Sequence, residues 1–69
     1  MGKWIGYETT EAYVAEIERQ YMVRVIHYCR TFKLYYRGCN ADGMIRFEFP
    51  KWAWTKGELM ELNDFIDEL

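Results

Sequence analysis

Two side chains could form a nucleophile–base pair, because His27 and Cys29 lie two positions apart. On a β-strand this spacing places both side chains on one face, where an imidazole could take the proton of a thiol. No carboxylate close in the sequence would orient the imidazole, and the chain contains no serine. We therefore expect a small apolar thiol and a partly satisfied imidazole on a half-buried strand, and a protein that is not an enzyme.

Metal and phosphate-loop chemistry have equally little support. The only soft metal ligands are His27, Cys29 and Cys39, and they lack the close pairing of a structural zinc site. The five glycines are scattered and form no phosphate-binding loop. We expect no metal and no cofactor. Both thiols are expected to be reduced, although a hairpin that brought Cys29 and Cys39 together would allow a disulfide.

The chain has 69 residues and 51% hydrophobic residues, which predicts a single small domain over residues 1–69. Such a chain buries only about 60% of the surface of its unfolded form, so we expect no deep enclosed active site. No apolar run approaches the roughly 20 residues that a bilayer span needs. Residues 1–7 lack an apolar signal core, so we expect a cytoplasmic protein that does not bind a membrane.

Apolar spacing predicts an α+β fold, in which two helices pack on one face of a small antiparallel sheet of two or three strands, in the order α-β-β-β-α. The expected elements are a helix at about 10–21 with Thr9 or Thr10 as its N-cap, strands at 22–28, 32–37 and 44–49, and a helix after Thr55. An alternative continues the first helix to about residue 29, because the apolar residues of 17–32 also keep helical spacing.

Two local signals are stronger than the rest. Asp42-Gly43 predicts the tight turn of a hairpin, and the strand after it alternates apolar and charged residues. Thr55 and Glu58 have the spacing of a capping box, in which each side chain bonds the other residue's backbone amide. Trp54 before this cap is expected to pack on the following helix as a hydrophobic staple.

Charge is unevenly distributed along the chain. Residues 19–56 carry eight of the nine cations, whereas residues 57–69 carry five carboxylates and no cation. This pattern predicts acidic helices and a basic sheet, although neutralisation of the two signs within one small domain is an equal alternative.

Three candidate surfaces follow from these positions. The acidic last helix could dock on a basic surface of another protein, and exposed aromatic side chains could anchor a partner. Cations beside tyrosines could instead bind phosphates and stack on bases. The acidic set is Glu58, Glu61, Asp64, Asp67 and Glu68. The aromatic set is Trp52, Tyr35 and Tyr36. The nucleic-acid set is Arg24, Arg30, Lys33, Arg37 and Arg46.

The expected element order resembles the double-stranded RNA-binding domain, whose last helix starts with lysines. Only Lys56 matches that pattern here, and Glu58 and Glu61 would repel phosphate, so the RNA-binding activity is not implied. The same size and order are similar to those of some small phage-encoded inhibitors, including anti-CRISPR proteins. On the acidic helix and on Trp52 and Tyr36, that resemblance implies a protein of the host cytoplasm that occludes a host effector.

We therefore expect a non-catalytic protein-binding module, an inhibitor or adaptor that blocks a larger protein, which could itself handle nucleic acid. One alternative is a nucleic-acid-binding module that uses a basic aromatic sheet face. Another is a self-associating structural or regulatory subunit, for example a homodimer with tryptophans at its interface.

Overall fold

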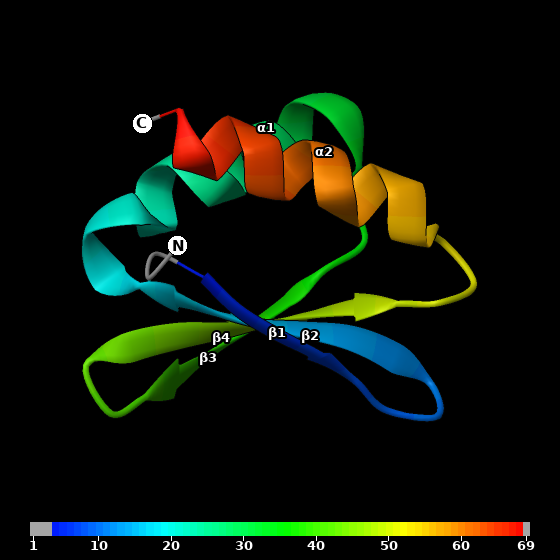
Figure 1. Cartoon of the computed structure of the whole chain (residues 1–69), viewed down its shortest axis with the longest axis horizontal. Helices are drawn as coiled ribbons and strands as arrows, with labels where there is room; N and C mark the ends of the chain where they lie inside the picture. Colours follow the sequence, from blue (N-terminus) through cyan, green and yellow to red (C-terminus); the bar gives the residue numbers. More distant parts are fainter. Residues whose placement is uncertain (1–3, 69) are drawn as a thin grey trace.

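The computed structural model describes residues 4–68, apart from the side chains of Trp4, Ile5 and Ala41. Two helices lie together on one face of an antiparallel sheet (Figure 1). The elements in chain order are β1 (Trp4–Glu8), β2 (Ala12–Glu18), the 3-10 turn η1 (Arg19–Tyr21), α1 (Met22–Phe32), β3 (Arg37–Ala41), β4 (Met44–Pro50) and α2 (Lys56–Asp67). Neither of these helices has the length and apolar character that crossing a bilayer requires.

The sheet has the strand order β1-β2-β4-β3, and every neighbouring pair is antiparallel. The chain therefore runs twice through the same order of elements, two strands followed by a helix. The second strand of each half lies in the centre of the sheet, and the first strand of each half lies at an edge. The α+β class, the antiparallel sheet and the two helices on one face confirm the sequence prediction.

The predicted strand number and order were wrong. Residues 12–18, expected to be helical, form the central strand β2, and residues 22–32, expected to be mostly strand, form α1. Pairing with both β1 and β4 decides the conformation of β2, because a central strand gains two ladders of hydrogen bonds. The alternative prediction of a helix over residues 22–29 was right for that segment, although this helix begins at Met22 and not near residue 10.

Threonine near the start of the chain has a different role from the predicted one. Thr9 does not cap a helix, because its hydroxyl accepts a 3.1 Å bond from the amide of Ala12 and closes the turn between β1 and β2. Short hydroxyl side chains bond nearby backbone in turns as readily as at helix starts. The sequence signal was therefore real, but it marked a hairpin.

The Asp42-Gly43 turn and the capping box of the last helix were confirmed. The strand expected at 32–37 was wrong, because residues 33–36 link α1 to β3, and pairing with β4 places β3 at Arg37–Ala41. Only Asp42 and Gly43 separate β3 from β4, and Gly43 has the positive φ of 70° that such turns favour. The capping box of α2 is complete: Thr55 Oγ1 accepts from the amide of Glu58 at 3.2 Å, and Glu58 Oε1 accepts from the amide of Thr55 at 2.8 Å.

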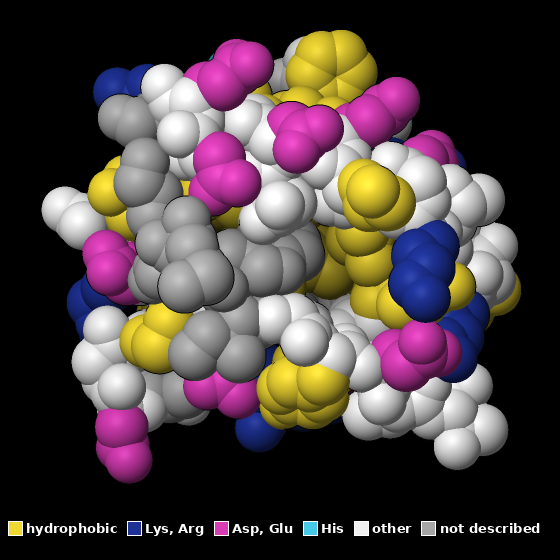
Figure 2. All heavy atoms as spheres, in the orientation of Figure 1, with side chains coloured by type: hydrophobic (Ala, Val, Ile, Leu, Met, Phe, Trp, Pro, Cys, Tyr) yellow, Lys and Arg dark blue, Asp and Glu magenta, His cyan; other side chains and the backbone are white. Residues whose placement is uncertain are grey.

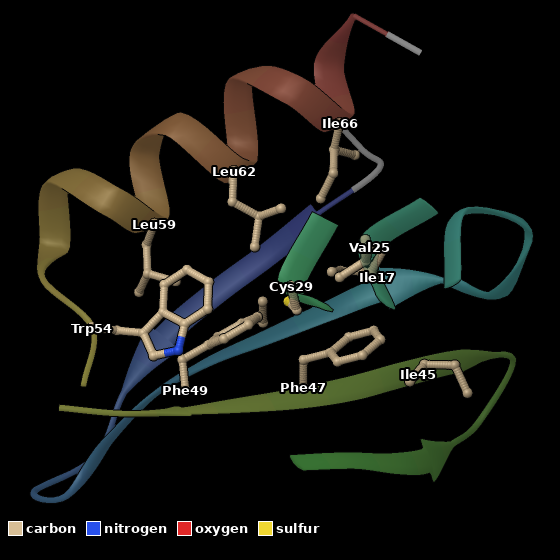
Figure 3. Close-up of a cluster of buried hydrophobic side chains, with 11 residues drawn as sticks. Ile17, Val25, Cys29, Ile45, Phe47, Phe49, Trp54, Leu59, Leu62 and Ile66 are labelled. Atoms are coloured by element: carbon tan, nitrogen blue, oxygen red, sulfur yellow. The ribbon is translucent and has the colours of Figure 1, made fainter. Parts of the chain in front are cut away.

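The core lies between the sheet and the two helices (Figure 3). Alternate residues of β4 point into it, and the helices contribute apolar residues at helical spacing. The labelled core residues are Ile17, Val25, Cys29, Ile45, Phe47, Phe49, Trp54, Leu59, Leu62 and Ile66. Because Phe47 and Phe49 face the helices, Arg46 and Glu48 point to the opposite, open face of the sheet.

Trp54 joins the core to two loops. Its ring centroid lies 4.7 Å from that of Phe49, and its indole N–H donates a hydrogen bond to the carbonyl oxygen of Tyr35. Lys33 Nζ donates to the carbonyl oxygen of Ala53 at 2.7 Å. These bonds hold the segment between α1 and β3 against the segment between β4 and α2.

Substitution Trp54→Phe should lower the free energy of unfolding by about 2 kcal/mol, because it removes the bond to Tyr35 and part of a ring that is only 2% exposed. The matched control Trp52→Phe changes a side chain that is 74% exposed and should have an effect within about 0.5 kcal/mol. Urea unfolding followed by circular dichroism measures both. Equal effects of the two substitutions would contradict the role given to Trp54.

Candidate functional site

An open groove of about 630 Å³ lies at one end of the open sheet face. Its floor comes from neighbouring positions on the central strands, because Ala12 of β2 pairs with Pro50 of β4, and Glu48 lies two residues before Pro50. Its wall comes from Tyr35 and Trp52, which follow α1 and β4 respectively. The groove thus combines residues that are far apart in the sequence.

Trp52 and Tyr35 form an exposed aromatic pair at this wall. Their ring centroids lie 4.7 Å apart at an interplanar angle of 61°, an edge-to-face arrangement. Trp52 remains 74% exposed and Tyr35 remains 52% exposed. Large apolar side chains that gather on a surface mark an interaction site more often than scattered ones do.

The structure brings together the three aromatic residues that the sequence suggested as partner contacts, since Trp52, Tyr35 and Tyr36 all line this groove. Their environments differ, because the ring of Tyr36 is half-buried and lies 5.9 Å from that of Phe47 in the core. Only Trp52 and Tyr35 are available as exposed anchors.

Sequence reasoning missed the floor of the groove. Ala12, Glu48 and Pro50 come together only through the register of β2 against β4, which no local pattern encodes. Glu11, in the turn before β2, completes one rim. The alternation of β4 was a usable signal, because it separates core-facing Phe47 from outward-facing Glu48.

The charges of the open face favour a protein over a nucleic acid. Among residues 6–68, Arg37 and Arg46 are the cations on the strands of this face, whereas four carboxylates lie on it or at its rim: Glu11, Glu16, Glu18 and Glu48. Arg46 Nε also lies 3.7 Å from a carboxylate oxygen of Glu48. Phosphate groups would meet more negative than positive charge here.

The five cations of the nucleic-acid set do not share a surface. Arg24 and Arg30 are exposed on α1, which covers the other side of the sheet from Arg37 and Arg46 (Figure 1). Lys33 is engaged by the carbonyl of Ala53 and by Glu58 Oε2 at 2.9 Å. The expected basic sheet is thus not observed, since the strands β1, β2 and β4 carry most of their charge as glutamate.

The acidic set lies on α2 or directly after its end, and Figure 2 shows Asp and Glu side chains gathered over this helix. Because α2 covers one face of the sheet (Figure 1) and the groove lies on the other, the acidic set is separated from the groove. Glu61, Asp64, Asp67 and Glu68 are exposed, and none forms an ion pair within residues 4–68. The acidic and aromatic sets therefore belong to two separate surfaces.

Glu58 differs from the rest of the acidic set, because it serves the fold. A hydrogen bond from Lys33, followed by bonds from Thr55, holds the pKa of the Glu58 carboxyl below its ordinary value of 4.5. Its carboxylate closes the capping box and pairs with Lys33. A partner would have to break these bonds to use it.

His27 and Cys29 lie on a helix and not on a strand, so the prediction that their side chains share one face was wrong. They therefore cannot act as a nucleophile–base pair. Two helical positions differ by about 200° in direction, and the structure leaves His27 exposed while Cys29 is fully buried. Burial raises the pKa of the Cys29 thiol to about 12. Both cysteines are free, and Cys39 lies on the open sheet face opposite Arg46. The described residues contain no group of three potential metal ligands.

Substitution Glu58→Gln should lower the urea midpoint at neutral pH, because it removes the ion pair with Lys33. The carboxylate has a lowered pKa, so its contribution is present above pH 4.5 and is lost as the pH falls through the folded pKa. The difference from the parent should therefore shrink in acid. Glu61→Gln, an exposed neighbour without an ion pair, is the control and should match the parent at each pH; a pH-independent deficit for Glu58→Gln would contradict the assignment.

The two thiols should differ in reactivity. In the native protein near neutral pH, an aromatic disulfide reagent should modify Cys39, which is partly exposed, and leave Cys29 protonated and shielded. Both should react after denaturation. The variant Cys39→Ala should lose the native reaction entirely, and reaction of two native thiols at one rate would show that Cys29 is accessible.

Comparison with known proteins finds no matching family model, no matching curated sequence and no matching solved structure.

Proposed function

We propose that this chain is a non-catalytic protein-binding module that docks on a larger protein through the groove beside Trp52 and acts as an inhibitor or adaptor in the cytoplasm. The observation that carries the proposal is the 74% exposed indole of Trp52, held edge-on against Tyr35. Burying a large apolar side chain at a partner contributes about 1.5–3 kcal/mol, and tryptophan is among the most frequent anchors of interfaces.

The rigidity of the surroundings supports the same proposal. Tyr35 is held through its carbonyl by the indole of Trp54, and Ala53 is held by Lys33, so hydrogen bonds join the two loops that form the wall of the groove. A preorganised surface loses less conformational entropy on binding than a mobile one. An exposed aromatic pair on such a surface is suited to a partner that presents a complementary apolar side chain.

A blocking role needs only a surface of this kind. An inhibitor of the phage-encoded type that the sequence resembles would cover a functional surface of its target and require no chemistry of its own. The described residues support a protein partner better than a nucleic acid, because carboxylates outnumber cations on the open face.

Affinity capture from extract with and without nuclease treatment, followed by mass spectrometry, tests the proposal. The parent chain and the control Met60→Ala, which truncates a 65% exposed side chain on α2, should retain the same protein. Trp52→Ala should weaken retention about tenfold or more, as truncation of an interface anchor does. Equal capture by Trp52→Ala, or capture that depends on nucleic acid, would refute docking through this groove.

A further inference from the structure

The outer face of the helix layer carries two rows of opposite charge, one on each helix. The α1 row consists of Arg24 and Arg30, which lie six residues apart and therefore point about 120° away from each other, to either side of the outer face of a helix that contains no carboxylate. The α2 row consists of Glu61, Asp64 and Glu68, which follow the spacing of one helix face. All five side chains are exposed, and none forms an ion pair within residues 4–68.

An aromatic strip separates the two rows. The ring centroid of Tyr28 on α1 lies 4.8 Å from that of Phe32 and 5.0 Å from that of Phe65 on α2. Phe32 is 67% exposed, so one end of this strip is open to solvent. Burial and then the carboxylate of Glu61 raise the pKa of Tyr28, as expected for a phenol with one member of the α2 row in its neighbourhood.

The two helices run in opposite directions along this strip. Tyr28 contacts Phe65, and Lys33, just after α1, pairs with Glu58 near the start of α2. The end of α1 that carries Arg24 therefore lies beside the end of α2 that carries Glu68. The charged residues of the α1 row therefore lie level with those of the α2 row along the helix axes.

We propose that this face binds a second copy of the chain, with α1 of each copy on α2 of the other. The twofold axis runs along the strip, parallel to the helices. Rotation about this axis places strip on strip and the basic row of each copy on the acidic row of its partner. An isologous interface needs such a self-complementary surface.

Charge complementarity selects this arrangement and this occupant. A twofold axis across the helices would set α1 on α1 and α2 on α2, so that like charges would meet. A basic protein surface would match α2 but be repelled by α1, and a nucleic acid would match α1 but be repelled by α2. Only a face with both rows, in the opposite order, matches both helices at once.

The size of the face predicts a weak dimer. The helices have 11 and 12 residues and are thus at most about 18 Å long. Two such helices side by side offer less than the roughly 800 Å² per partner of a standard interface. Association should therefore depend on concentration and weaken with salt, because the rows are exposed at the rim. The groove beside Trp52 lies on the other side of the sheet and stays free in each copy.

Sedimentation velocity of the full chain, from low concentration up to about 1 mM at low ionic strength, measures the association. The parent should form dimers. The variants Arg24→Glu/Arg30→Glu and Glu61→Lys/Glu68→Lys should each weaken dimerisation at least tenfold, since every substitution acts twice in a symmetric dimer.

The combination of all four substitutions decides the pairing. It exchanges the signs at both ends of the two rows, Arg24 with Glu68 and Arg30 with Glu61, and leaves the net charge unchanged, so it should restore dimerisation to within about threefold of the parent. Arg37→Glu reverses a charge on the open sheet face and should leave dimerisation unchanged; circular dichroism confirms that each variant is folded. Three results would overturn the proposal: a parent chain that stays monomeric at about 1 mM, a double variant that dimerises as well as the parent, or a quadruple variant that fails to dimerise.

Discussion

The architecture depends on the burial of one indole. Trp54 packs on Phe49 and donates its N–H to the carbonyl of Tyr35, so a single side chain belongs to the core and to a loop at once. In a chain of 69 residues few contacts are available to order a loop. A buried aromatic ring with a polar group provides both apolar contact area and a directional hydrogen bond. Because Tyr35 is held in this way, its ring meets Trp52 and the groove has a wall.

Two neighbouring tryptophans thus have opposite roles. Trp54 faces the helices and is almost fully buried, whereas Trp52, two residues earlier, is on the groove side and largely exposed. The capping box at Thr55 begins α2 directly after Trp54 and fixes which of the two rings enters the core. Placing one ring inside and one outside provides both a stable loop and a candidate anchor for a partner.

The open sheet face and the outer face of the helix layer differ in their pattern of charge. On the open sheet face carboxylates exceed cations beside an aromatic pair, while the helix face carries a basic row and an acidic row that do not pair within the described chain. Glu58 and Lys33 form an ion pair with each other and thereby stabilise the fold. The separation allows one face to bind a different protein while the other binds a copy.

Local sequence patterns alone determined three features: the Asp42-Gly43 turn, the alternation of inward and outward side chains on β4, and the cap of α2. They also determined the acidic character of α2 and suggested Trp52 as a candidate anchor, although its exposure was decided by the tertiary structure. Only the tertiary structure decided that residues 12–18 are a strand and residues 22–32 a helix, because apolar spacing in these segments fits both periods and the pairing of β2 with β1 and β4 resolves the choice. The floor of the groove and the opposition of the charge rows likewise depend on strand register and helix direction, which arise from contacts between residues distant in the sequence.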